Sequence, residues 1–182
     1  MAEAVLFTVP AIIYLLVQSR GTGKDLGSAR QRLGASWGSR SSYAWALLLL
    51  LPLLVASGLA FMLIPPGAVL DAPGVTIARI TSASGVIAMV LRAVGEEIFF
   101  RGLLGGVLVR RLGFLRGNLL QATVFVLPHL ALLLVDTRLW PVIPVQFAAG
   151  WLLGWLRHKT GTFVPGAAVH TITNAVAGLV VL

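Results

Sequence analysis

The sequence contains no cysteine and few charged residues. Without cysteine the chain forms no disulfide and offers no thiolate to a metal ion, and it carries no signal of redox compartment. Charged residues make up 11% of the 182 residues, whereas a soluble domain usually has about 25%. Hydrophobic residues make up 58%, more than a soluble chain of this size can bury. They come in long unbroken runs, which indicates segments that lie in a bilayer.

Acidic residues are the scarcer charge, with six Asp and Glu against 14 Lys and Arg and a net charge of +8. Such an excess could favour nucleic acid, but the basic residues lie mostly in short stretches between apolar runs. Stretches 19–42, 110–117 and 157–161 carry five, three and two Lys or Arg, whereas 65–76 and 136–139 carry none and one. This alternation follows the positive-inside rule. It argues against a nucleic-acid partner and predicts cytoplasmic basic loops with both termini outside.

The apolar runs predict an all-α, polytopic transmembrane bundle of about six helices within a single integral-membrane domain, 1–182. We expect N-terminal helices over about 3–18 and 43–64, and a core over about 77–182 with helices over 77–110, 118–135, 140–156 and 163–182. The first is expected to be retained, because it lacks the basic start and cleavage site of a signal peptide. As a helix, segment 77–110 would be roughly 50 Å long, whereas the hydrocarbon core of a bilayer is about 30 Å thick. The segment must therefore tilt, project from the membrane or break.

Charged residues inside one apolar run are the first candidate site, because a charge in a membrane segment is costly and marks function by default. Glu96, Glu97 and Arg101 lie in the third run. Glu97 and Arg101 are spaced i,i+4, as are Arg92 and Glu96, so each pair can form on one helix face. Pairing that neutralises one glutamate would leave the other free for chemistry. Two structural salt bridges without chemistry are an equal alternative for this pattern alone.

Histidine and asparagine supply the other candidates. His129 lies in the fourth run, and His170 and Asn174, four residues apart, share one face of the sixth. Taken singly, such residues are more often polar contacts between helices. Counted from the predicted cytoplasmic helix ends, however, Glu97, His129 and Asn174 all lie roughly 16–20 Å deep. Three separate segments would thus bring acid–base groups to a similar depth, which favours a shared site.

These residues form three short motifs along the chain: Glu-Glu-x-x-x-Arg at 96–101, Phe-x-x-x-His at 125–129 and His-x-x-x-Asn at 170–174. The third motif is preceded by Lys-Thr-Gly-Thr-Phe-Val-Pro-Gly at 159–166. Over residues 90–178 the chain resembles the CPBP family, which comprises type 2 CAAX prenyl endopeptidases and bacteriocin-processing (Abi) proteins. The resemblance implies a glutamic-type intramembrane endopeptidase, sometimes described as a metalloprotease. Its substrate would be a membrane-anchored protein or peptide precursor, and its partners that substrate and the lipid bilayer.

The residue roles that the resemblance implies can be placed on this sequence. Glu96 would be the general base and His129 would help to hold the water. His170 and Asn174 would stabilise the oxyanion, with Glu97 and Arg101 as the supporting pair. No cofactor is expected, because no His-Glu-x-x-His motif is present and asparagine is a poor zinc ligand; one zinc ion held by two histidines and a glutamate is the alternative.

Two further classes stay open. Intramembrane Glu and His chains also serve proton-relay transporters, although few polar residues lie in the outer halves of the last three runs. A non-catalytic membrane scaffold or immunity protein that keeps the site residues is the third interpretation. For any of these the expected location is an integral, multi-pass protein of a bacterial inner membrane.

Overall fold

The structure is a computed structural model that describes the whole chain except residues 1, 21–24, 69–70, 73–74, 77–81 and 181–182. Its long helices are α1 Ala2–Gln18, α3 Arg40–Leu63, α4 Ala83–Glu96, α5 Gly106–Val126, α7 Val142–Thr160 and α8 Val164–Val180. The shorter elements are α2 Leu26–Leu33, the π-helix η1 Glu97–Gly105, the 3-10 helices η2 Leu127–Leu130 and η3 Thr137–Leu139, α6 Ala131–Val135, and the strands β1 Asp71–Ala72 and β2 Val75–Thr76. The predicted all-α bundle is confirmed, with one pair of two-residue strands beside it among the described residues.

The prediction that 19–42 is a loop is wrong, because α2 lies within it. The Asp25 side chain caps this helix by accepting from the backbone N–H of Ser28 at 2.7 Å, and Gly34 ends it in the left-handed conformation at φ 78°. Both residues are ordinary helix-boundary signals. They were hidden by the low hydrophobicity of the segment, which marked it as a connection.

The long third run stays helical and changes its geometry instead of stopping. Its predicted start, 77–81, lies outside the described residues, and α4 begins after Ser82, whose hydroxyl accepts from the N–H of Gly85 at 3.1 Å. The helix then widens into η1 and continues as α5 until Gly113, where φ 75° and ψ 169° break it. Glycine adopts such a φ without steric cost. The described part of this run is therefore unbroken up to its predicted end at 110, and the helix breaks just beyond it, at Gly113.

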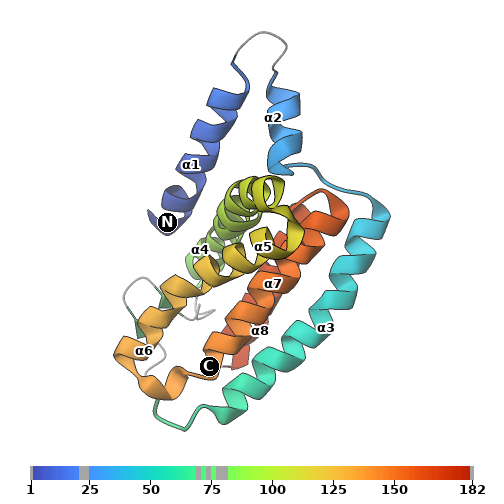
Figure 1. Cartoon of the computed structure of the whole chain (residues 1–182). Coiled ribbons are helices and arrows are strands. Elements are labelled where there is room, and N and C mark those ends of the chain that lie inside the picture. The colour runs from blue at the N-terminus through green and yellow to red at the C-terminus, as the bar shows by residue number, and fades with distance from the viewer. Residues whose placement is uncertain (1, 21–24, 69–70, 73–74, 77–81, 181–182) are drawn as a thin grey trace.

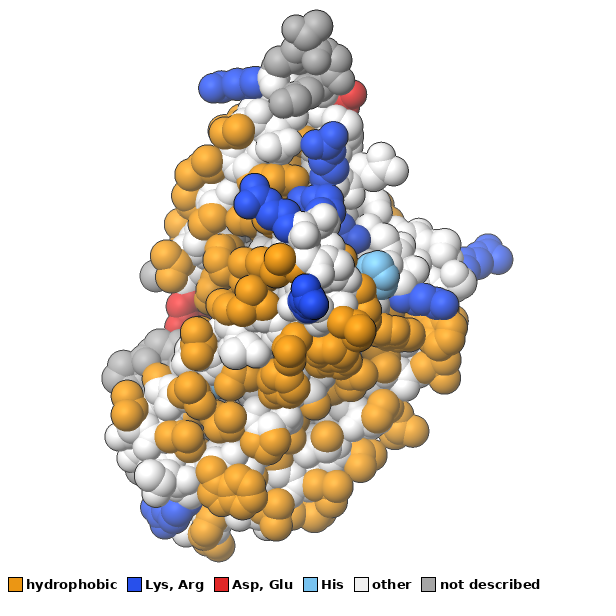
Figure 2. All heavy atoms as spheres, in the orientation of Figure 1, with side chains coloured by type: hydrophobic (Ala, Val, Ile, Leu, Met, Phe, Trp, Pro, Cys, Tyr) orange, Lys and Arg blue, Asp and Glu red, His pale blue; other side chains and the backbone are white. Residues whose placement is uncertain are grey.

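Three helical stretches of the described chain are long and apolar enough to cross a membrane: Arg40–Leu63, Ala83–Val135 and Thr137–Thr160. The second contains the break at Gly113 and so covers two of the six predicted helices. Helices α1 and α8 have 17 residues each, close to the shortest length that spans a bilayer. Apolar side chains cover most of the visible face in Figure 2, while Lys and Arg gather towards the end where α2 lies.

The arrangement of the helices places α7 and α8 inside the bundle (Figure 1). Helix α7 packs on α5 and α3, and α8 packs on α3 and α4. Helices α1 and α2 form a separate arm against α4 and η1. Close packing of α5 on α7 depends on Gly150, where a Cβ atom would lie 3.2 Å from the Ala122 Cα. The polar residues of α4, η1, η2 and α8 are thereby directed at a common interior.

Candidate active site

The two glutamates lie where the helix changes from α to π geometry. Glu96 is the last residue of α4 and Glu97 the first of η1, and both are buried. π-Helical turns are rare and are often found at functional sites. Here the wide turn keeps Glu97 and Arg101 on one face, with Arg101 Nη1 2.7 Å from Glu97 Oε1. The ion pair predicted from sequence spacing is confirmed, and both of its side chains are almost completely buried.

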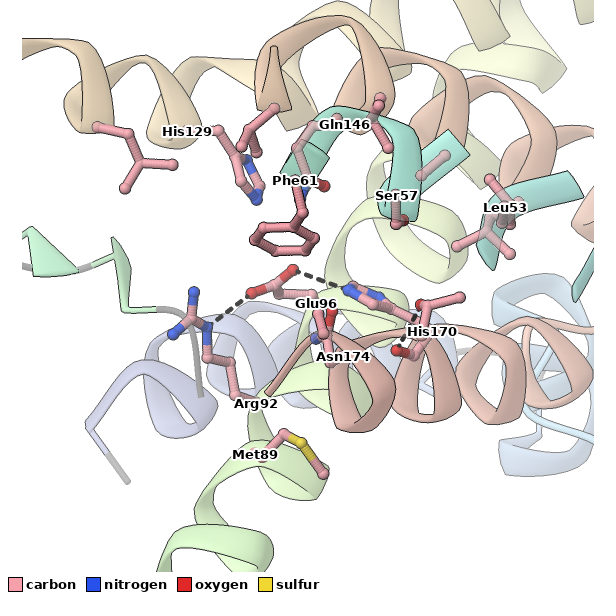
Figure 3. Close-up of a pocket in the computed structure, with 18 of the residues that line it drawn as sticks. Leu53, Ser57, Phe61, Met89, Arg92, Glu96, His129, Gln146, His170 and Asn174 are labelled. Carbon is pink, nitrogen blue, oxygen red and sulfur yellow. Dashed lines mark hydrogen bonds and ion pairs between the residues drawn. The ribbon is translucent and has the colours of Figure 1, made fainter. Parts of the chain in front are cut away.

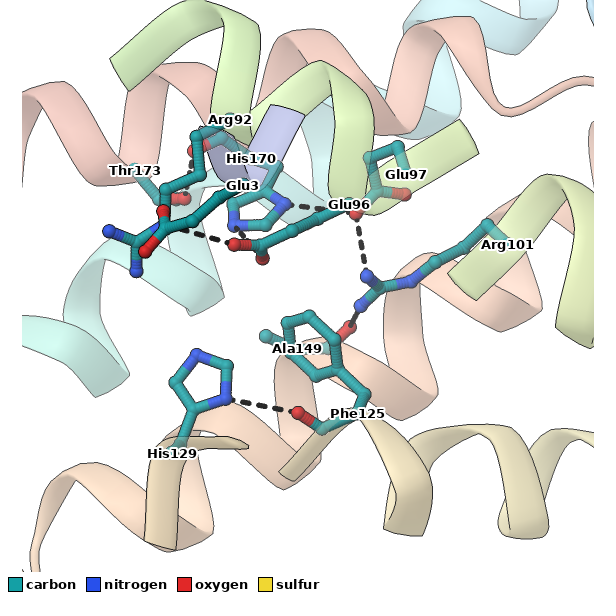
Figure 4. Close-up of polar contacts among 10 residues, drawn as sticks. All are labelled: Glu3, Arg92, Glu96, Glu97, Arg101, Phe125, His129, Ala149, His170 and Thr173. Atoms are coloured by element: carbon teal, nitrogen blue, oxygen red, sulfur yellow. Dashed lines mark hydrogen bonds and ion pairs between the residues drawn. The ribbon is translucent and has the colours of Figure 1, made fainter. Parts of the chain in front are cut away.

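Glu97 also holds a histidine from the far end of the chain. His170 Nδ1 lies 2.9 Å from Glu97 Oε1, and a carboxylate only accepts, so Nδ1 donates. Arg101 is held in turn by the Ala149 carbonyl, to which Nη2 donates at 3.4 Å, and by the Phe125 ring, 4.1 Å from its guanidinium carbon. Figure 4 shows this chain of contacts from Arg101 through Glu97 to His170. Glu97 therefore fixes the orientation of the His170 ring.

Glu96 faces a different set of partners. Arg92 Nε lies 3.1 Å from Glu96 Oε1, which confirms the second predicted pair, and 3.3 Å from Glu3 Oε2 of α1. His170 Nε2 lies 3.7 Å from Glu96 Oε2. Each glutamate therefore has an arginine partner, Arg92 for Glu96 and Arg101 for Glu97. The difference between the two is burial: Arg92 keeps a side-chain exposure of 21%, whereas that of Arg101 is 0%.

His129 comes from the short 3-10 helix that ends the α5 segment. Pro128 precedes it, and proline is compatible with the first turn of a helix but not with its interior. His129 Nδ1 lies 3.0 Å from the Phe125 carbonyl oxygen. A carbonyl only accepts, so Nδ1 carries a proton, and in the neutral ring Nε2 is then an acceptor. His129 lines the same cavity as Glu96 and His170, and Figure 4 shows its ring on the opposite side of the drawn cluster from them.

One cavity of about 320 Å³ is lined by all four predicted catalytic residues, Glu96, His129, His170 and Asn174. They come from α4, η2 and α8, which are far apart in the sequence. Figure 3 shows Glu96 near the centre, with His170 and Asn174 close to it and His129 beyond the Phe61 ring in this view. The structure thus brings the four residues together around a single space, with Glu97 and Arg101 directly behind it.

The cavity has further lining residues that sequence reasoning missed. Ser57 and Phe61 of α3 and Gln146 of α7 all line it. Ser57 and Phe61 lie in an apolar run that gave no reason to single them out. Gln146 is different, because it is a lone polar residue within the run 140–156 and could have been found by that signal.

The zinc alternative would need three or more ligating side chains around one point. No group of three or more His, Cys, Asp or Glu side chains in the described part of the chain is placed to hold a metal ion. The Nδ1 atoms of His129 and His170 are engaged by the Phe125 carbonyl and by Glu97, so only their Nε2 atoms remain as acceptors.

A bundle of apolar helices with two carboxylates and two imidazoles around one interior cavity defines a polytopic α-helical membrane protein with an acid–base centre. The family model for type II CAAX prenyl endopeptidases, Rce1-like, matches residues 78–176, more than half of the chain. The protein belongs to this family, as the sequence resemblance indicated, and is an integral membrane protein of a peptidase family. The matched region includes every candidate site residue. Curated proteins and solved structures gave no match.

Proposed function

We propose that this protein is an intramembrane endopeptidase that hydrolyses a peptide bond of a membrane-anchored protein or peptide precursor, with Glu96 as the base that activates water. The observation that carries the proposal is the single cavity lined by Glu96, His129, His170 and Asn174. Family membership supports peptidase chemistry. We propose that the protein is a multi-pass protein of a bacterial inner membrane.

Water activation is assigned to Glu96 and His129. A water molecule between them would donate one hydrogen bond to the Glu96 carboxylate and one to His129 Nε2, which is an acceptor because Nδ1 donates to the Phe125 carbonyl. Glu96 takes a proton from the water as the oxygen attacks the carbonyl carbon of the scissile bond. The same carboxyl group then returns the proton to the leaving amine when the C–N bond breaks.

Stabilisation of the oxyanion is assigned to His170 and Asn174. The Asn174 amide can donate from its NH₂ group. His170 can donate from Nε2 only when the ring is protonated, since Nδ1 already donates to Glu97. His170 Nε2 lies 3.7 Å from Glu96 Oε2, next to the proposed base. Donors fixed in a water-poor site are worth most at the moment when charge develops.

The test is cleavage of membrane-anchored peptides, prenylated and unprenylated, by the purified protein in lipid vesicles. Glu96→Gln keeps the shape of the side chain and should lower the rate about 10²- to 10⁴-fold, the usual share of general acid–base catalysis. Glu3→Gln is the matched control, because it removes the same charge beside the same Arg92 and along the same cavity, from a side chain that is 36% exposed, and it should keep most of the activity. Full cleavage by Glu96→Gln would end the proposal in favour of another catalytic group.

Metal dependence is settled in the same assay. For the site proposed here, preincubation with a strong zinc chelator should leave the rate unchanged. A loss of activity that added zinc restores would replace the metal-free mechanism by a zinc-dependent one. Absence of cleavage by the wild-type protein towards every peptide, with folding intact, would favour a non-catalytic scaffold.

A further inference from the structure

A second cavity, of about 330 Å³, lies between α5 and α7 and is lined by Arg101, which does not line the catalytic cavity formed by Glu96, His129, His170 and Asn174. Arg101 and Gln121 form its buried inner end. Arg110, Arg157 and His158 form its outer end, where Arg110 and His158 are exposed. We call this space the basic chamber. Its size is at the lower end of the range for small-molecule sites, about 300–1,000 Å³.

The arginines at the outer end of the basic chamber have only neutral partners among the described residues. Arg110 donates to the Arg32 carbonyl and to the Tyr14 hydroxyl, each at 3.1 Å. Arg157 donates to the same Arg32 carbonyl at 3.2 Å, and its Nε is buried without a hydrogen-bond partner. No Asp or Glu of the described chain lines the chamber. Two guanidinium groups are thus held together on one carbonyl without an anion, although arginine strongly favours anionic partners.

Gln121 is the second observation, and it is independent of the charges. Its side chain is completely buried at 0% exposure and lines the chamber. Neither its amide oxygen nor its amide nitrogen has a hydrogen-bond partner within the described part of the chain. Its neighbour Asn118, by contrast, donates to the Trp151 carbonyl at 3.0 Å. Buried amides are nearly always satisfied, so this one calls for a polar group inside the chamber.

The backbone is also shaped around Gln121. A Cβ atom at Gly154 would lie 2.6 Å from Gln121 Oε1 and closer still to Asn118 Oδ1. Glycine at this point of α7 therefore leaves room for the two amide side chains. A glycine inside a helix costs about 1 kcal/mol relative to alanine, so the room is kept at some expense in helix stability.

The position of the chamber indicates the kind of ligand. Its outer end lies at the predicted cytoplasmic side, where the basic stretches 110–117 and 157–161 meet, and Figure 2 shows Lys and Arg side chains gathered over this end of the molecule. Basic pockets between helices on the cytoplasmic side suit anionic lipid headgroups. A phosphate at Arg110 and Arg157, with a hydroxyl-bearing headgroup reaching Gln121, would satisfy both sets of groups.

We propose that the basic chamber between α5 and α7 binds a phosphate-bearing anionic ligand, the headgroup of a phospholipid of the cytoplasmic leaflet such as phosphatidylglycerol. The guanidinium groups of Arg110 and Arg157 bind the phosphate, and the Gln121 amide donates to and accepts from the hydroxyl groups of the headgroup. The site does not depend on peptidase activity, so it stands or falls separately from the proposed function.

The experiment counts phosphatidylglycerol molecules retained by the full-length protein in detergent, by native mass spectrometry over a series of lipid concentrations. Arg157→Gln should weaken retention roughly tenfold, the value of one charged hydrogen bond. Gln121→Glu, which has the same shape, should weaken it at least as much because it adds a negative charge inside the chamber. Arg116→Gln is the matched control: it removes the same charge from an exposed position of the other basic stretch, 110–117, outside the chamber, and should change nothing.

Three outcomes decide the proposal. Equal retention by Gln121→Glu, Arg157→Gln and Arg116→Gln overturns it, and so does equal retention of phosphatidylcholine, which carries no net charge. Displacement of the lipid by millimolar inorganic phosphate or glycerol phosphate supports the phosphate site but assigns it to a free ligand. Thermal unfolding of each variant in detergent checks that it is folded. If Arg157→Gln does not fold, the comparison of Gln121→Glu with Arg116→Gln still tests the proposal.

Discussion

The two adjacent glutamates should differ sharply in how much stability is lost when each is replaced by glutamine. Glu97→Gln removes the anion from Arg101, whose side chain has an exposure of 0%. Breaking a buried pair in this way costs about 3–5 kcal/mol, because a charge is left uncompensated in the interior. For a chain of this size that corresponds to a fall of about 6–20 °C in the unfolding temperature.

Glu96→Gln should cost far less stability. Its partner Arg92 has a side-chain exposure of 21% and keeps Glu3 at 3.3 Å, and partly exposed ion pairs are worth about 0–1 kcal/mol. The unfolding temperature should therefore change by a few degrees at most. Activity should nevertheless be lost, because the carboxylate that faces the catalytic cavity is gone.

The assay is thermal unfolding followed by tryptophan fluorescence in one detergent, with peptide cleavage measured in parallel. The double variant Glu97→Leu with Arg101→Met should regain stability relative to Glu97→Gln, because replacing a whole buried pair by apolar residues is often neutral or stabilising. It should stay inactive, since His170 Nδ1 has lost its acceptor. Equal unfolding temperatures for Glu96→Gln and Glu97→Gln would refute the reasoning, as would a double variant no more stable than Glu97→Gln.

Two further predictions concern packing. Gly154→Ala places a Cβ atom against Asn118 and Gln121 and should lower the free energy of unfolding by about 1–3 kcal/mol. Its control is Gly58→Ala, which meets nothing within 4 Å and should be neutral or stabilise by up to about 1 kcal/mol. Unfolding in detergent measures both variants, and equal effects would contradict the role given to Gly154. Phe61→Ala should enlarge the catalytic cavity and raise the rate for bulkier side chains next to the scissile bond relative to small ones, and an unchanged ranking across a peptide series would show that the Phe61 ring does not limit the space.

The apolar helices could be predicted from the sequence because a segment buried in a bilayer needs a long run of apolar residues, which is easy to recognise. The pairs Glu97–Arg101 and Arg92–Glu96 followed from spacing along one helix. The meeting of Glu97 with His170 did not, because it joins residues 73 positions apart and depends on how α8 packs against η1.

Other parts of the structure were out of reach of pattern reasoning for different reasons. The π geometry of η1 has no residue signature within an apolar run. The lining by Ser57 and Phe61 depends on which face α3 turns inward, and that helix is apolar on all sides. Helix α2 did carry boundary signals, but it is too short and too polar to be recognised as a membrane-length apolar run.

Because η1 is a π-helix of nine residues, the number of residues in this segment decides which way the glutamates point. Each turn of a π-helix holds more residues than an α-helical turn, so removing one residue there would allow the segment to close into ordinary α-helix. Because one residue turns an α-helix by about 100°, everything before the deletion would rotate relative to α5. Glu96 would then point at a neighbouring helix or at lipid even though every polar residue was still present, which makes residue count as restrictive here as residue identity.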